Sequence, residues 1–116
     1  MPHIHLETTA DLQENGEIPQ ILERLIIALA SVESISTTSI KAYHTLRTNW
    51  MVGEGHPEGF AHCTLGVLSG RSPELRAKLA DTVFAELKRC FEFSDQEGGV
   101  AVTLEVRDMD ALTYRR

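Results

Sequence analysis

The sequence predicts an α/β fold of the α+β type, in which two tandem β-α-β units form one four-stranded mixed sheet with both helices on one face. Four segments alternate apolar and polar residues, as strands half-buried in a sheet do. Two longer segments repeat apolar residues at helical spacing. The length of 116 residues fits one domain. We therefore expect a single domain over 1–116, with pseudo-repeat halves at about 2–52 and 58–107.

The first unit begins almost at the start of the chain. Residues 2–8, PHIHLET, place Ile4 and Leu6 on one face of a strand. The breaker cluster ENGEIP follows, and it leads into a helix over 18–33 whose apolar residues recur every three or four positions. Residues 40–48, IKAYHTLRT, alternate again and predict the second strand.

The second unit has the same order. Residues 60–68, FAHCTLGVL, predict the third strand. Ser72 is a suitable N-cap for a helix with Pro73 at its first position, and apolar residues at helical spacing continue to Cys90 or Phe91. The segment GGVAVTLEVRD then alternates apolar and polar residues, which predicts the fourth strand.

The connections predict how the strands pair. A helix between two strands of one sheet serves as a crossover, which implies parallel pairing within each unit. With both helices on one face, the other face of the sheet is uncovered. We expect that face to carry Ile, Leu and Val side chains and to be buried against other copies of the chain.

Composition limits the partners and the compartment. A formal net charge of -6 and a pI of about 5.3 argue against nucleic acid or an anionic membrane as the main partner. The two cysteines, Cys63 and Cys90, lie in different segments, so we expect reduced, buried and inert thiols. No segment approaches the roughly 18 apolar residues of a membrane span, and the first residues lack the features of a signal peptide. We expect a cytoplasmic protein.

The second residue is a candidate catalytic group. Removal of Met1 would leave Pro2 with a free secondary amine instead of an amide. The pKa of an α-amine lies near about 8 in model peptides, and both burial and neighbouring cations lower it. A base whose pKa lies near the working pH suits proton transfer. The alternative interpretation is that Pro2 is an ordinary second residue.

Three stretches carry a resemblance to a known family: MPH at the start, the Trp and Gly of Trp50 to Gly55, and HCTLGVLSGRS from His62 to Ser72. The last stretch contains His-x-Thr-Leu, four further residues, and then Gly-Arg-Ser. Through these residues the chain resembles the 5-carboxymethyl-2-hydroxymuconate isomerase family of the tautomerase superfamily. The resemblance runs from Pro2 through the second predicted helix and is weaker after about residue 92.

The resemblance implies a function and a set of site residues. It implies a homotrimer that isomerises 5-carboxymethyl-2-hydroxymuconate or a related 2-hydroxydienoate in aromatic-compound catabolism, with Pro2 as general base and acid and with no cofactor or metal. It implies that Arg71 and position 41 hold carboxylates of this small anionic dienol substrate. Lys41 and Tyr43 stand where the family has arginines, and lysine lacks the bidentate fork that suits a carboxylate. We expect His3, next to the base, to shape the rim of the pocket.

Other interpretations stay open. The two replaced arginines would also fit a trimeric binding protein of this fold without activity, or a tautomerase of a different enol acid. His3 and His5 share a strand face with Glu7 and could bind zinc, although their spacing matches no recognised ligand motif. For His62 the alternation favours a hydrogen-bonded structural role over catalysis.

Overall fold

The observed strands and helices follow the predicted order. The computed structural model describes residues 2–33, 35–54 and 58–116, so Gly55 of the matched Trp50–Gly55 stretch lies outside the described residues. The helix predicted over 18–33 and the strand predicted over 60–68 are confirmed at both bounds. The strands predicted over 2–8 and 40–48 are confirmed to within one residue at each end. The elements are β1 (His3–Thr9), the 3-10 helix η1 (Gln13–Glu17), α1 (Ile18–Glu33), the 3-10 helix η2 (Thr37–Ser39), β2 (Lys41–Arg47), β3 (Phe60–Leu68), α2 (Pro73–Cys90), α3 (Glu92–Gly98) and β4 (Ala101–Met109).

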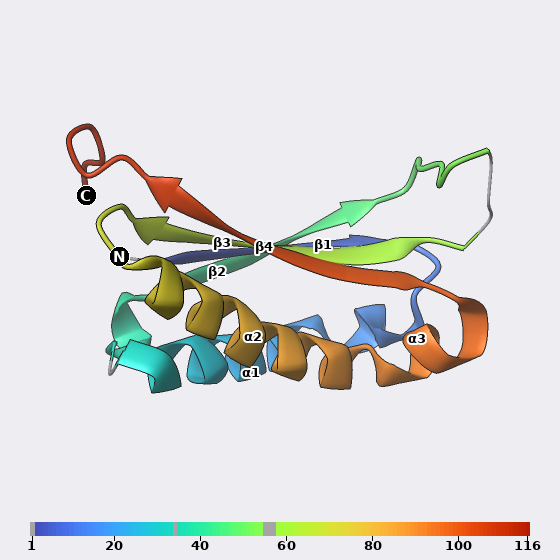
Figure 1. Ribbon diagram of the computed structural model, residues 1–116. Coiled ribbons are helices and arrows are strands. Elements are labelled where there is room, and N and C mark those ends of the chain that lie inside the picture. The colour runs from blue at the N-terminus through green and yellow to red at the C-terminus, as the bar shows by residue number, and fades with distance from the viewer. Residues whose placement is uncertain (1, 34, 55–57) are drawn as a thin grey trace.

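The four strands form one mixed sheet in the order β2-β1-β3-β4. Strand β1 pairs parallel with β2, and β3 pairs parallel with β4, as expected for two crossover units. The two units meet through the antiparallel β1–β3 pair at the centre of the sheet. Both long helices lie on the same side of the sheet, as Figure 1 shows, and the predicted fold class is confirmed.

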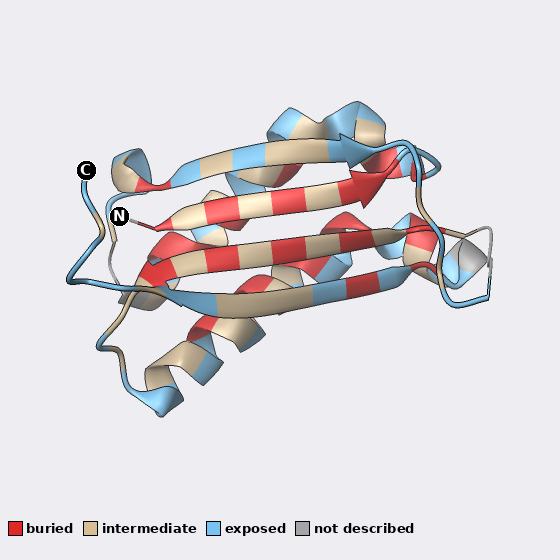
Figure 2. Cartoon of the chain, turned by 90° about the horizontal axis from the view of Figure 1, so that it is seen from above, coloured by how far each residue is buried: buried red, intermediate tan, exposed pale blue. Residues whose placement is uncertain are grey.

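The core lies between the sheet and the helices. In β1 and β3 every second residue is buried, which Figure 2 shows as alternating colours along the two central strands. Ile4, Leu6 and Leu65 are fully buried, and they pack in one cluster with Leu25 of α1 and Val83 of α2. The two helices are also joined by an ion pair of 2.6 Å between Arg24 and Glu86. Within the described residues, none of the helices combines the length and apolar character needed to cross a membrane.

The expectation that Ile, Leu and Val cover the open face is wrong. Each strand has one apolar face, and that face is the one covered by α1 and α2. The residues that alternate with the core residues are mostly polar: in β1 they are His3, His5 and Glu7, at intermediate burial. The open face of the sheet is therefore a polar surface, and its composition alone gives no hydrophobic reason for covering it.

The sequence patterns did not predict the short helix α3. Ser94 of this helix is buried, and both its backbone N–H and its hydroxyl donate hydrogen bonds to the carboxylate of Glu14 in η1. Phe91, which precedes α3, is fully buried in the core. This helix thus depends on contacts with a segment about eighty positions earlier in the chain.

Candidate active site

Pro2 is held at the head of the central strand β1. It is buried, and its position continues the buried series of Ile4 and Leu6. Its carbonyl accepts a hydrogen bond of 3.1 Å from the backbone N–H of Lys41, the first residue of β2. This residue is therefore fixed by the sheet, although residues near a chain end are usually poorly ordered.

The strand register places several predicted site residues in rows across the open face. His3 pairs with Lys41 on one side and with Gly66 of β3 on the other, and Gly66 pairs with Arg107 of β4. This row is the first beyond Pro2, and it carries two cationic side chains. Among the described residues, no carboxylate forms an ion pair with the Lys41 ammonium group, which is exposed.

Arg71 lies at the same end of the sheet as Pro2, in the turn between β3 and α2. Gly70 has a φ of 112°, a left-handed conformation that glycine adopts at little cost. The next residue, Arg71, donates a 2.8 Å hydrogen bond from Nη1 to the carbonyl of Leu68 at the end of β3. Ser72 then caps α2, because its hydroxyl oxygen accepts a hydrogen bond from the backbone N–H of Leu75, as predicted.

The open face is hollowed between β1 and β4 into a trough of about 640 Å³. Two of the predicted site residues, His3 and Tyr43, line it. Pro2, Lys41 and Arg71 lie outside its lining, at or beyond the end where β1 begins. His5, Glu7 and His62, which the sequence suggested only for a zinc site or a structural role, also line it. The lining residues that were not predicted at all are Thr64, Gly66, Glu105, Arg107, Asp108, Met109 and Tyr114. The alternation along β1, β3 and β4 contained the signal for most of these residues, since they share the polar face.

His3 has a specific partner from the far end of the chain. Its Nε2 lies 2.9 Å from the hydroxyl of Tyr114, and the two rings meet edge to face at 79°. Burial, and then the positive charge of Lys41, lower the pKa of His3 below its ordinary value. The neutral imidazole is therefore favoured near neutral pH.

Tyr43, which the resemblance implies to replace an arginine, presents an aromatic ring. It stacks on His5 with a centroid separation of 4.5 Å and an interplanar angle of 22°. Its exposed fraction is 49%, so the phenol is accessible from solvent. This position offers a neutral hydroxyl and a ring face, where arginine would offer a charged fork for a carboxylate.

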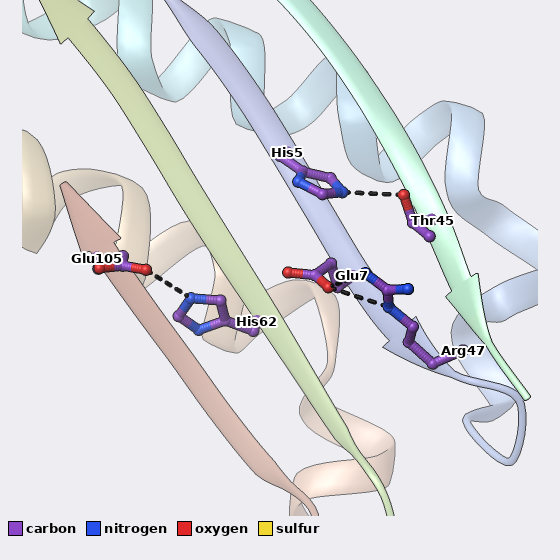
Figure 3. Close-up of polar contacts among 6 residues, drawn as sticks. All are labelled: His5, Glu7, Thr45, Arg47, His62 and Glu105. Atoms are coloured by element: carbon purple, nitrogen blue, oxygen red, sulfur yellow. Dashed lines mark hydrogen bonds and ion pairs between the residues drawn. The ribbon is translucent and has the colours of Figure 1, made fainter. Parts of the chain in front are cut away.

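The charged groups farther along the open face are paired with one another (Figure 3). Arg47 donates to Glu7 at 2.7 Å, and this hydrogen bond holds the pKa of the Glu7 carboxyl below its usual value. Glu105 accepts from Arg107 at 3.0 Å and lies 3.3 Å from Nε2 of His62. Hydrogen bonds from Arg107, and then from His62, lower the pKa of Glu105. These pairs leave little net charge in the middle of the trough.

The histidines on the open face are held by hydrogen bonds to side chains of neighbouring segments. His62 also has its Nδ1 2.7 Å from the hydroxyl of Thr103, so its predicted hydrogen-bonded position is confirmed. For the zinc alternative, His5 and His3 use Nε2 for different partners, Thr45 and Tyr114. Within the part of the chain that the structure describes, no group of three or more His, Cys, Asp or Glu residues is placed to hold a metal ion.

The prediction of buried thiols is confirmed. Cys63 and Cys90 are both free and buried. Burial raises the pKa of the Cys63 thiol to about 12 and that of Cys90 to about 11. Both therefore stay protonated at neutral pH, and neither is suited to act as a nucleophile.

Comparison with known proteins places this geometry in a family. The profile of the 5-carboxymethyl-2-hydroxymuconate isomerase family matches residues 2–116. A 5-carboxymethyl-2-hydroxymuconate Delta-isomerase from Escherichia coli is 23% identical over 110 residues, which cover 94% of this chain and 87% of the relative. The crystal structure of a 5-carboxymethyl-2-hydroxymuconate isomerase from Deinococcus radiodurans R1 superposes with a TM-score of 0.89 at 25% identity, covering 99% of this chain and 87% of that one.

The fold is also shared more widely. A fused 4-OT protein, a symmetric trimer, superposes with a TM-score of 0.74 at 14% identity, over 93% of this chain and 85% of that one. At this identity the likeness concerns the fold alone. The chain belongs to the 5-carboxymethyl-2-hydroxymuconate isomerase family, a group of isomerases within the tautomerase superfamily.

Proposed function

We propose that this protein is a cofactor-independent keto-enol tautomerase with the nitrogen of Pro2 as its general base and acid. Its substrate would be 5-carboxymethyl-2-hydroxymuconate or a related 2-hydroxydienoate from aromatic-compound catabolism. One observation supports this most directly: Pro2 is buried and hydrogen-bonded to Lys41 at the head of β1, next to the row that carries Lys41, His3 and Arg107.

The proposed base requires the removal of Met1, which converts the Pro2 nitrogen from an amide to a secondary amine. Burial disfavours the protonated amine, and the nearby charge of Lys41 disfavours it further. Both effects bring the amine toward the pKa range in which a group can accept and return a proton near neutral pH. The five-membered ring also limits the motion of the nitrogen, which favours a fixed geometry of transfer.

One residue can complete the reaction. The Pro2 amine accepts the proton of the enol hydroxyl, and the electron pair of that O–H bond forms the keto carbonyl as the double bonds shift along the diene. The protonated amine then donates the same proton to the carbon at which negative charge has accumulated. Lys41 and Arg71 would hold the substrate carboxylates and stabilise the dienolate as its charge develops.

The test follows the absorbance of the dienol form of 2-hydroxymuconate and of its carboxymethyl derivative. We expect rapid loss of the signal with wild-type protein and a large decrease in kcat for Pro2→Ala, because a primary amine on a flexible residue is less well oriented. Arg71→Ala should chiefly raise KM. Intact-mass analysis is run in parallel to establish whether Met1 is absent. A rate no higher than that of buffer, from protein that lacks Met1, would reject the proposal.

Two observations favour a substrate with fewer carboxylates as a second candidate. Lys41 provides one charge without a fork, and Tyr43 provides a phenol that is stacked on His5. Together these groups would favour a monoacid over a diacid more than a pair of arginines would. The ratio of kcat/KM for the monoacid and the diacid distinguishes the two candidates.

We further propose that the protein works as a homotrimer in the cytoplasm. The open face carries a trough of about 640 Å³ whose charges are paired within the chain, a surface suited to a polar, hydrated contact between copies. A related fold assembles as a symmetric trimer. Light scattering should give three times the 12.9 kDa of one chain, and a monomeric mass would contradict the assembly.

The proposed cytoplasmic location is supported by the two buried free thiols, which fit a reducing compartment.

A further inference from the structure

The segment that follows β4 has a defined shape. Its backbone turns at Asp110, whose carbonyl accepts a 2.9 Å hydrogen bond from the N–H of Tyr114. The Asp110 carboxylate accepts from the N–H of Leu112 at 2.9 Å, and the N–H of Ala111 donates to the Ser69 hydroxyl at 3.1 Å. Figure 1 shows that this segment lies at the end of the sheet where the chain starts. The turn therefore brings Tyr114 back to the first row of the open face.

Tyr114 meets His3 at this end of the sheet. The 2.9 Å contact joins the phenol oxygen to Nε2 of the imidazole, and both side chains line the trough. Among the described residues, Nδ1 of His3 has no hydrogen-bond partner. The side chain that forms a hydrogen bond with the Tyr114 hydroxyl is that of His3. The ring thus has one nitrogen engaged by Tyr114 and one nitrogen available beside Pro2.

A neutral imidazole carries a single N–H, so the partner of one nitrogen decides the role of the other. When the Tyr114 hydroxyl donates to Nε2, the proton of the ring resides on Nδ1. The Nδ1–H group is then a neutral donor in the row next to Pro2, where Lys41 also lies. This donor could bind an oxygen of an acid substrate without adding another charge to the site.

We propose that Tyr114 is a positioning residue that donates a hydrogen bond from its hydroxyl to Nε2 of His3 and thereby presents Nδ1–H to an oxygen of the bound dienol acid. The proposal deepens the function proposed above and rests on it for the identity of the ligand. His3 would be the residue that touches substrate, and Tyr114 would act through it. Through this pair, a residue more than one hundred positions away from Pro2 would act on its site.

The first measurement is the tautomer of His3, read from imidazole ¹⁵N chemical shifts at neutral pH. We expect the Nδ1–H form in wild type and the Nε2–H form, which free imidazole side chains prefer in water, in Tyr114→Phe. This variant keeps the ring and removes only the hydroxyl, so the fold should be retained. An Nε2–H form in the wild type would overturn the proposal.

The second measurement is the Kd of cis,cis-muconate, a diacid that lacks the enol hydroxyl and so binds without reacting. Loss of an aligned donor to a carboxylate should weaken binding by about 3- to 10-fold in Tyr114→Phe. In His3→Asn the amide nitrogen lies near the place of Nδ1 and needs no help from Tyr114. We therefore expect near wild-type affinity in His3→Asn, with no further loss on adding Tyr114→Phe. His3→Gln places its amide near Nε2 instead and should bind about as weakly as Tyr114→Phe.

These results separate the proposal from the function on which it rests. Pro2→Ala should lose turnover while keeping the His3 tautomer and the muconate Kd within about twofold. An inactive wild type with the expected tautomer and affinity changes would reject the tautomerase and support the positioning role. An unchanged muconate Kd in Tyr114→Phe would overturn the positioning role, whatever the activity of the wild type.

Discussion

The backbone N–H of Lys41 donates a 3.1 Å hydrogen bond to the carbonyl of Pro2, and this bond joins the proposed base to the residue that would bind the substrate. Because β1 and β2 run parallel, the heads of both strands lie at the same end of the sheet. The amine and the cation are therefore positioned by the same ladder of hydrogen bonds. A change of the Lys41 side chain should alter charge and contacts while leaving this backbone bond in place.

Substitution of Lys41 should affect both binding and the pH profile. We expect Lys41→Met to lower kcat/KM for a dienol diacid by about 10- to 100-fold, because a positive charge beside the substrate carboxylate is lost. Loss of that charge should also move the acidic limb of the kcat/KM profile to higher pH, since the protonated amine of Pro2 becomes easier to form. Lys41→Arg should lower KM for the diacid by restoring the fork.

The control for this series is Lys78→Met, which removes an exposed lysine from the N-terminal half of α2 and leaves the open face unchanged. It should have wild-type kcat/KM and the same pH profile. Equal activities in Lys41→Met and Lys78→Met would remove Lys41 from the site.

Local sequence patterns predicted the strands, the long helices and the N-cap at Ser72, because each depends on residues close together in the chain. The same patterns showed which residues share a strand face. They did not show that the apolar residues of the strands pack mainly on the side of α1 and α2, which is why the open face was expected to be apolar. That outcome depends on how much helix surface covers the sheet, a property of the assembled fold.

Long-range contacts determine the features that local sequence patterns did not predict. The segment EFSDQEG has little apolar periodicity, and α3 is fixed by the carboxylate of Glu14. Tyr114 joins the candidate site through a contact with His3, 111 positions away. Pro2 was named from the chemistry of a free N-terminal amine, Lys41 and Arg71 were named from the family resemblance, and the roles of all three stay predictions. The alternation alone placed His3 on a strand face without indicating its partner.

Glu14 should be important for stability. Its two carboxylate oxygens accept from the backbone N–H and the hydroxyl of Ser94, and both residues are buried. In Glu14→Gln an amide NH₂ group replaces one of the two carboxylate oxygens. That group faces a donor of Ser94 and cannot accept its hydrogen bond. We therefore expect a loss of about 1 to 3 kcal/mol in the free energy of unfolding. Urea denaturation followed by circular dichroism measures the loss.

A matched variant on the same network is Ser94→Ala, which removes one of the two donors and keeps the backbone N–H. Its loss should be about 1 kcal/mol. The double variant should lose less than the sum of the two single losses, because both changes affect the same hydrogen bond. Strict additivity would show that the contact contributes little.

Gly59 should tolerate no side chain. A Cβ atom built on it would lie 1.7 Å from the Thr9 hydroxyl oxygen, which itself accepts a 2.9 Å hydrogen bond from the N–H of Phe60. The N–H of Gly59 donates to Asp11 at 3.0 Å, so the backbone cannot move away without breaking that bond. Overpacking of this kind costs about 1 to 3 kcal/mol, and we expect at least that loss for Gly59→Ala in urea denaturation.

Gly16→Ala provides the comparison, because a Cβ atom at Gly16 meets nothing within 4 Å. Its free energy of unfolding should change by less than about 0.5 kcal/mol or rise slightly through reduced freedom of the unfolded chain. Similar losses in the two variants would mean that the close approach to Thr9 is relieved at little cost.

The stability of the protein should decrease as the pH falls from 7.5 to 5.5, in part because of His44. Its Nε2 lies 2.7 Å from the Thr8 hydroxyl, which donates its own proton to Asn15, so His44 supplies the N–H of this contact. Burial, and then the charge of His5, lower the pKa of His44 below the ordinary value of 6.5. A lowered pKa means that the unfolded chain binds protons first, so the stabilisation is complete above pH 6.5 and is lost as the pH falls toward the folded-state pKa.

The test compares thermal unfolding of the wild type and His44→Gln at pH 7.5 and 5.5. Glutamine keeps an N–H donor for Thr8 and does not titrate, so the fall in Tm across this range should be smaller in the variant. His3 also has a lowered pKa and should account for part of the remaining slope, which makes His3→Gln the second arm of the test. The paired carboxylates of Glu7 and Glu86 have pKa values lowered below 4.5 and lose their stabilisation only at more acidic pH, outside this window. An equal fall in Tm for the wild type and His44→Gln would show that protonation of His44 is not what destabilises the fold.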